Sequence, residues 1–201
     1  MKLNGWIWFG VFISVLIWSG VAPKDYYTWA LEVLPAVIGA LLLWITRQRF
    51  PLTSLLYCLI LLHCIVLMVG GHYTYAEVPL GDWVRDWLSG TRNNYDKLGH
   101  FMQGFVPAIL AREILIRQQV VNSSAWRTLF IIAICLGFSA FYELIEWWVA
   151  LLSDEAAESF LGTQGYAWDT QSDMFWALIG ATTALLSLAR WHDLQLQRLK
   201  P

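Results

Sequence analysis

Seven ionisable residues that stand in or beside apolar stretches are the residues of this sequence best suited to chemistry. They are His72, Asp96, His100, Glu143, Glu146, Asp169 and Asp173. Apart from His72, they form three pairs whose partners are three or four residues apart, and such partners share one face of a helix. Because a charge facing lipid is costly, these faces should turn inward. The sequence therefore predicts one polar pocket built from four helices.

Metal binding is the first chemistry that such a pocket would support. Imidazole and carboxylate groups together suit Zn²⁺, Mn²⁺ or Fe²⁺ and leave room for a metal-bound water. The candidate ligands are His72, His100, Glu143, Glu146 and Asp173. A divalent metal is the cofactor that this pattern allows, and the residues alone leave open whether one is bound.

Acid–base chemistry is the second chemistry that such a pocket would support. Crowded acids at low dielectric repel one another and lose solvation, so some stay protonated at neutral pH and can act as a general acid or a proton relay. The candidate catalytic residues are Asp96, His100, Glu143, Glu146, Asp169 and Asp173. In either chemistry Asp96 could orient the His100 imidazole.

The same residues also have a structural interpretation. Glu143 or Glu146 could pair with a basic residue of the segment 85–97, and His100 could hydrogen-bond to Gln103 or to a backbone carbonyl. This pattern does not decide between an enzyme and a protein that only binds a ligand.

Three other features of the apolar stretches bear on the pocket and on helix packing. Glu32 could cap a helix or join the edge of the pocket, and capping is preferred. His63, in the middle of its stretch, is interpreted as a neutral, hydrogen-bonded histidine. Gly104 and Gly180 predict sites where two helices approach closely.

The composition identifies the elements that must position these groups as membrane helices. Of 201 residues, 58% are hydrophobic and 14% charged, against about 25% charged in soluble chains. The thirteen tryptophans suit a chain anchored repeatedly at membrane surfaces. A net charge of -2 argues against nucleic acid as a partner and leaves the lipid bilayer as the expected one.

Six stretches are long and apolar enough to span a bilayer. They cover residues 4–22, 29–46, 52–71, 98–117, 128–152 and 173–190. The pair Gly70-Gly71 is interpreted as the break that ends the third. We therefore expect an all-α, six-helix transmembrane bundle that forms a single domain over residues 1–201, with a short amphipathic helix on the membrane surface near 80–89.

The distribution of basic residues predicts the orientation of the bundle. With both termini in the cytoplasm, nine Lys and Arg residues lie inside and four outside, as the positive-inside rule requires. The segment 153–172, which contains no Lys or Arg, is then an external loop. The predicted pocket faces outward.

Four motifs give the sequence a family resemblance. They are GHYTY (71–75), YDKLGHF (95–101), YELIEW (142–147) and WDTQSDM (168–174). This set resembles the bacterial YjdF inner-membrane family over nearly the full length. The resemblance implies a multi-pass protein of the bacterial inner membrane and carries no catalytic assignment.

A more distant similarity is to the VanZ-like group, in which a D-K-x-x-H helix start precedes an acidic helix and a later aspartate helix. Asp96-Lys97-Leu98-Gly99-His100 matches the first element, and Asp173 with Gly180-Ala181 matches the last. Between them the sequence lacks the Gln and Arg that usually follow the acid, and Ala177 stands where Asn is common. The similarity implies a shared fold.

Three functions fit these observations. The leading hypothesis is an outward-facing His/Asp/Glu pocket that binds, or acts on, an envelope lipid or a lipid-linked headgroup. The first alternative is a small ion- or proton-coupled transporter that uses the same acids. The second is a non-catalytic subunit of a membrane complex, and the sequence does not identify a protein partner.

Overall fold

A computed structural model describes residues 5–152 and 164–199 and confirms the all-α fold class. These residues form seven helices and no strand. They are α1 (Gly5–Gly20), α2 (Tyr26–Thr46), α3 (Ser54–Tyr73), α4 (Pro79–Trp87), α5 (Tyr95–Arg117), α6 (Ser124–Leu152) and α8 (Asp169–Leu199). Helix α4 corresponds to the amphipathic helix expected near 80–89. Residues 153–163 of the expected external loop lie outside the described residues.

Short polar side chains fix where α2 and α3 begin. Asp25 caps α2 by accepting a 2.6 Å hydrogen bond from the Thr28 backbone N–H, which lowers the pKa of the Asp25 carboxyl. Thr53 caps α3 in the same way through the Leu56 N–H. At its other end α3 stops at Thr74, whose backbone is left-handed with φ 58°.

The glycine pair in α3 is not a break. The helix continues through Gly70 and Gly71 to Tyr73, two residues beyond the predicted end. A side chain at Gly70 would collide with the Tyr75 ring, which folds back against the helix after the turn at Thr74. The glycine is therefore needed for close approach, and it lets Tyr75 enter the bundle.

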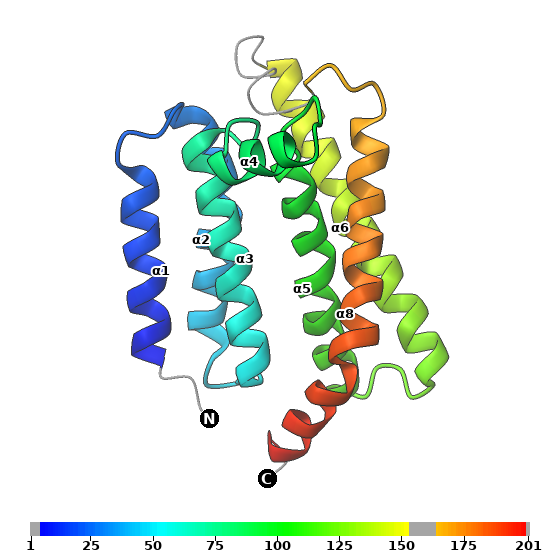
Figure 1. Cartoon of the computed structure of the whole chain (residues 1–201). Coiled ribbons are helices and arrows are strands. Elements are labelled where there is room, and N and C mark those ends of the chain that lie inside the picture. Colours follow the sequence, from blue (N-terminus) through cyan, green and yellow to red (C-terminus); the bar gives the residue numbers. More distant parts are fainter. Residues whose placement is uncertain (1–4, 153–163, 200–201) are drawn as a thin grey trace.

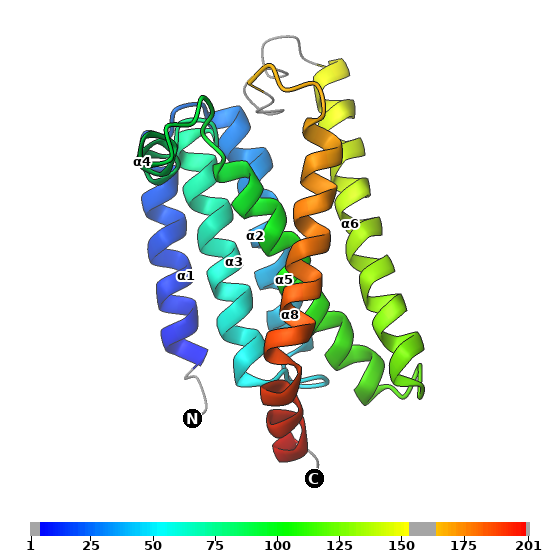
Figure 2. The ribbon, with the colours of Figure 1, turned by 45° about the vertical axis from the view of Figure 1, so that its right-hand side comes forward.

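Helix α5 is the centre of the bundle, and α8, α6 and α3 pack around it (Figure 1). Helices α1 and α2 pack against α3 on the other side, with a smaller apolar core of their own. Figure 2 shows the same arrangement turned by 45°, with α5 between α3 and α8. Polar groups placed on α5 can therefore meet groups from α3, α6 and α8.

Two small residues bring the α5 and α8 backbones into contact. A Cβ atom on Gly104 would overlap the Ala177 carbonyl, and one on Gly180 would overlap the Phe101 carbonyl. The close packing predicted at both glycines is confirmed. It fixes the distance between the polar ends of the two helices.

We expect Gly104→Ala to destabilise the protein by roughly 1–3 kcal/mol or more, because the added methyl group must push two backbones apart. The matched change Gly137→Ala, on α6, meets no atom within 4 Å and should leave stability unchanged or slightly raised. Thermal unfolding in detergent would compare the two. Equal melting temperatures would contradict the proposed backbone contact.

Four of the described helices, α2, α3, α6 and α8, are long and apolar enough to cross a membrane. Helix α1 is apolar but has only 16 residues. Helix α5 is outside this set because charges lie near both ends, such as Asp96 and Lys97 at one and Arg112 and Glu113 at the other. Most of the residues of α5 between these charges are buried, so neighbouring helices shield it.

A buried ionic network closes the end of the bundle opposite α4. Glu113 and His192 are fully buried, and the Thr53 hydroxyl donates to Glu113 at 2.8 Å. Arg112 can only donate, so its 3.0 Å contact makes His192 Nδ1 an acceptor and leaves the proton on Nε2, 3.0 Å from Glu113. Arg117 also donates to Glu113. The network ties the start of α3 to α5 and α8.

Candidate functional site

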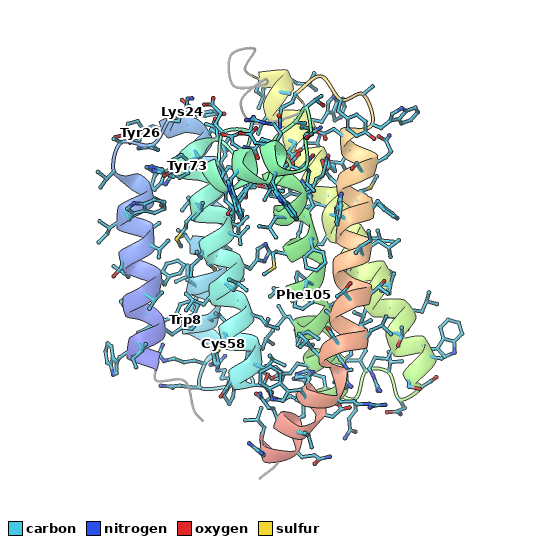
Figure 3. The ribbon with its side chains drawn as sticks, viewed as in Figure 1. Trp8, Lys24, Tyr26, Cys58, Tyr73 and Phe105 are labelled. Atoms are coloured by element: carbon cyan, nitrogen blue, oxygen red, sulfur yellow. The ribbon has the colours of Figure 1, made fainter. Side chains whose placement is uncertain are left out.

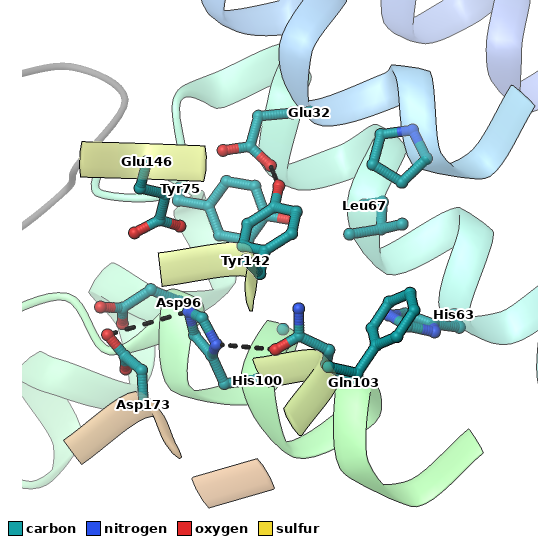
Figure 4. A pocket seen from close by; sticks show the side chains of 13 residues that line it. Glu32, His63, Leu67, Tyr75, Asp96, His100, Gln103, Tyr142, Glu146 and Asp173 are labelled. Atoms are coloured by element: carbon teal, nitrogen blue, oxygen red, sulfur yellow. Dashed lines mark hydrogen bonds and ion pairs between the residues drawn. The ribbon is translucent and has the colours of Figure 1, made fainter. Parts of the chain in front are cut away.

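A small polar cavity lies near the α4 end of the bundle, between α2, α3, α5, α6 and α8 (Figure 4). Its volume is about 80 Å³. The lining residues are Glu32, Pro35, His63, Leu67, Tyr75, Asp96, Gly99, His100, Gln103, Phe138, Tyr142, Glu146 and Asp173. Four of them are acids and none is Lys or Arg, so the cavity suits a positively charged ligand.

The His100 imidazole lies between acids from two other helices. Its Nδ1 is 3.1 Å from Gln103 Oε1 and 3.8 Å from Glu143 Oε1, and its Nε2 is 3.8 Å from Asp173 Oδ2 (Figure 4). One ligand atom each from His100, Glu143 and Asp173 lie within 4.8 Å of one another. Helices α5, α6 and α8 thus each contribute one buried, metal-ligating group.

The hydrogen bond between His100 and Gln103 determines which ring nitrogen of His100 carries the proton. With Gln103 placed so that its Oε1 faces the ring, Oε1 can only accept, and Nδ1 therefore carries the proton of a neutral ring. The Nε2 lone pair then points toward the Asp173 carboxylate. A separation of 3.8 Å is too long for a hydrogen bond, but it leaves room for a cation bound to both acceptors.

Glu143 supplies a carboxylate oxygen without a hydrogen-bond partner. Its Oε1 is fully buried, and no group in the described parts of the chain donates to it. The residue is only 8% exposed. Leaving a buried acceptor unpaired costs about 1–3 kcal/mol, and more if it is charged. A cation at this point would remove that cost.

A second cluster lies against the first and consists of ion pairs. Lys97 Nζ is 2.6 Å from Asp169 Oδ1 and 2.6 Å from Asp173 Oδ1, and 3.5 Å from Asp96 Oδ2. Arg92 pairs with Asp96 and, at 2.7 Å, with Asp169. Asp173 therefore belongs to both clusters, with one oxygen on Lys97 and the other toward His100.

Arg92 stands just before α5, outside the membrane helices. Burial opposes its charge, but its bonds to Asp169 and Asp96 hold the pKa of the guanidinium above its usual value. The next residue, Asn93, exchanges two backbone hydrogen bonds with the Gln164 side-chain amide, at 3.1 and 2.7 Å. These contacts hold the loop before α5 against the chain before α8.

The remaining acids of the pocket, Glu32 and Glu146, form no ion pair with another described residue. The Tyr142 hydroxyl donates to Glu32 at 3.3 Å, and Glu146 is buried in the cavity wall. The ion pairs among the described residues link Lys97 and Arg92 to aspartates instead of to Glu143 or Glu146. The alternative was that Glu143 or Glu146 pairs with a basic residue of the segment 85–97. The ion pairs of Lys97 and Arg92 given above are not of that kind.

His72 does not join the pocket. Its Nδ1 lies 3.0 Å from the Ser19 carbonyl oxygen, and its ring packs 4.7 Å from that of Trp18 on α1. The reason is helical rotation: His72 follows the cavity residue His63 by nine positions, about two and a half turns, and so points to the opposite face of α3. We therefore leave His72 out of the candidate ligand set.

One expected role, the orienting of His100, falls to another residue. Asp96 was expected to orient His100, but it binds Arg92 and Lys97, and Gln103 makes the contact with the ring. The alternative hydrogen bond from His100 to Gln103 is confirmed. Asp96 and Asp169 instead hold the cations that neighbour Asp173.

The structure adds site residues that the sequence analysis missed or ranked low. They are Glu32, His63, Tyr75 and Tyr142 in the cavity lining and Lys97 in the neighbouring ion-pair cluster. Lys97 had a signal, because it follows Asp96 in the first turn of a helix and precedes His100 by three residues. Tyr75 had none, because its position depends on the turn at Thr74.

The long apolar helices identify this chain as a helical membrane protein. The chain belongs to the family of predicted membrane proteins DUF2238, which it matches over residues 4–194. It is 54% identical to "Inner membrane protein YjdF" of Escherichia coli (strain K12) over 184 residues, which cover 92% of this chain and 88% of that protein. No solved structure matches it.

These comparisons confirm the predicted family and, with the apolar helices, the assignment to the inner membrane as a multi-pass protein. The similarity to the VanZ-like group stays a prediction.

Proposed function

We propose that the chain forms one domain with six membrane-spanning helices, α1, α2, α3, α5, α6 and α8, and that both termini are cytoplasmic. The two ends of the described chain, at α1 and α8, lie at the same end of the bundle, as an even number of crossings requires (Figure 1). Figure 3 places Lys24 and Tyr26 at the α4 end and Trp8 and Cys58 toward the other. The α4 end would then face outward.

The distribution of basic residues supports this orientation. Among the described residues, four basic residues lie toward the α4 end, Lys24, Arg85, Arg92 and Lys97, and seven lie toward the opposite end, Arg47, Arg49, Arg112, Arg117, Arg127, Arg190 and Arg198. The positive-inside rule counts Lys and Arg, so this excess places the opposite end in the cytoplasm.

Labelling in intact cells would test the topology. In a chain without its native cysteines, Asp86→Cys should react with a membrane-impermeant maleimide, because α4 would lie outside. Arg198→Cys, near the end of α8, should react only after the cells are opened. The reverse pattern would contradict the orientation.

Within this arrangement we propose that the polar pocket binds the headgroup of an envelope lipid, and that His100, Glu143 and Asp173 hold a divalent cation there. The observation that carries the proposal is the convergence of these three buried groups beside the unpaired Oε1 of Glu143. One imidazole and two carboxylates suit Zn²⁺ or Mn²⁺.

The surrounding groups fit a headgroup that carries phosphate. A divalent cation in an acidic pocket attracts phosphate oxygens that the acids alone would repel. Lys97 adds a positive charge next to Asp173, and Asp96 and Asp169 position it. Glu146 and the Tyr142 hydroxyl, in the cavity wall, are placed to give or accept a proton at the headgroup.

The cavity lining favours lipid over a transported ion or proton. Among the described residues, the lining from His63 toward the opposite end of the bundle is mostly apolar. A proton path would need polar groups at close intervals along that route. A lipid needs a polar site at one end only.

Lipid analysis of the reconstituted protein would test the function. Protein reconstituted in nanodiscs of Escherichia coli polar lipids and Mn²⁺ should enrich or convert one lipid class, as measured by mass spectrometry. His100→Ala, Glu146→Gln and Asp173→Asn should each abolish this effect at normal membrane abundance, whereas the exposed control Asp86→Asn should keep it. Failure of all three pocket variants to fold, or the same lipid profile in every variant, would overturn the proposal.

A further inference from the structure

A second, larger cavity lies below the polar pocket and is apolar. Its volume is about 530 Å³. The walls come from α2, α3 and α5, and Phe138 of α6 lies at the junction with the pocket. The lining residues are Pro35, Ala36, Gly39, Leu42, Leu43, Thr46, Phe50, Leu52, Ile60, His63, Cys64, Leu67, Val106, Pro107, Leu110, Ile114, Gln118 and Phe138. We call it the apolar groove.

The apolar groove and the polar pocket are adjacent. They share Pro35, His63, Leu67 and Phe138 as lining residues. Along α2 the groove runs from Pro35 to Thr46, which at 1.5 Å per residue is about 16 Å. That length is roughly half of a hydrocarbon core of about 30 Å. It covers the half that lies toward the end of the bundle opposite α4, because Thr46 ends α2 and the lining residue Gln118 follows the end of α5.

Two of the helices that bound the groove, α2 and α5, do not pack on one another. Helix α2 packs against α3, and it has no comparable interface with α5 or α6 in the described residues. Where the groove meets the pocket, Phe138 is 58% exposed, so the wall is open toward the surrounding lipid. Gly39 lies in the α2 wall, and a Cβ atom added there would meet no atom within 4 Å.

We propose that the apolar groove holds one hydrocarbon chain of the lipid whose headgroup enters the polar pocket. This inference rests on the proposed function and names its ligand class: a lipid with a phosphate-bearing headgroup and at least one chain long enough to extend from the pocket past mid-bilayer toward the opposite surface. A chain gains little hydrophobic energy on leaving the bilayer, because the bilayer is equally apolar. The groove therefore acts by aligning the chain under the pocket.

Photo-crosslinking would locate the chain. The protein is placed in phosphatidylcholine nanodiscs that contain phosphatidylethanolamine or phosphatidylglycerol with a diazirine in one acyl chain, and crosslinked residues are mapped by mass spectrometry. We expect crosslinks to concentrate on the groove walls, at residues 60–67 and 106–110. Crosslinks spread evenly over the exposed faces of α1 and α6 would mean that only surrounding lipid contacts the protein, and would overturn the inference.

A leucine at position 39 would fill the groove without disturbing the helices. Gly39→Leu should reduce the groove crosslinks by about tenfold, which corresponds to about 1.4 kcal/mol. Gly137→Leu is the matched control, because this helical glycine on α6 also has open space but lies outside the groove. Equal crosslinking in the two variants would contradict the proposal.

The two proposals fail in different ways. If the headgroup function is wrong, the groove crosslinks persist but do not respond to His100→Ala or to the removal of divalent cations. If the groove inference is wrong, the pocket variants still change the retained lipid, while Gly39→Leu has no effect.

Discussion

Replacing Lys97 with methionine should destabilise the protein by roughly 3–5 kcal/mol, the usual cost of removing one partner from a buried ion pair. Lys97 is 7% exposed and has two aspartate oxygens at 2.6 Å. Methionine keeps the length of the side chain but leaves Asp169 and Asp173 without this cation. The melting temperature in detergent, followed by size-exclusion chromatography, would measure the loss.

Two controls separate charge from packing. The exposed pair Lys24–Glu77 offers a matched site, and Lys24→Met should change stability by about 1 kcal/mol or less. Adding Asp169→Asn to Lys97→Met should restore part of the loss, because one buried negative charge is removed. A Lys97→Met protein as stable as the wild type would show that the ion network does not hold α5 to α8.

Replacing Glu143 with glutamine should lower the affinity for Mn²⁺ or Zn²⁺ by at least about 100-fold, since loss of even a supporting residue commonly costs 10–100-fold. The same change should leave the stability of the metal-free protein unchanged or higher, because the unpaired Oε1 loses its charge. These opposite effects distinguish a ligand from a structural acid. Calorimetric metal titration and thermal unfolding with chelator would measure them.

Asp86→Asn is the control for this experiment, since it removes an exposed acid of α4. It should change neither property. Loss of stability in Glu143→Gln together with unchanged metal affinity would mean that Glu143 supports the fold and holds no cation.

The sequence predicted the helices better than their rotation about their own axes. Apolar length located each of the six expected spans on a described helix, because burial in lipid requires long apolar stretches. The sixth, expected over 173–190, is part of the longer helix α8, which continues to Leu199. Which face of α3 meets α5 depends on packing between helices. For that reason His72 was grouped with the pocket while His63, on the opposite face, was not.

The spacing of acids and imidazoles predicted most of the candidate site. His100, Glu143 and Asp173 come together because each lies on the inward face of its helix. The ion pairs were not predictable, since the reach of Lys97 to α8 depends on the backbone contact between Gly104 and Ala177. The place of Gln103 beside His100 followed from helical spacing, because the two are three residues apart.

The central claim is that acids and an imidazole from three helices form one cation site under the outer surface of the membrane. Pulsed electron paramagnetic resonance of Mn²⁺ bound to the purified protein tests it most directly, because coupling to a nitrogen nucleus identifies a histidine ligand. We predict one Mn²⁺ per chain with a single nitrogen coupling that disappears in His100→Ala and persists in His72→Ala. Absence of saturable Mn²⁺ binding, or a nitrogen coupling that survives in His100→Ala, would contradict the claim.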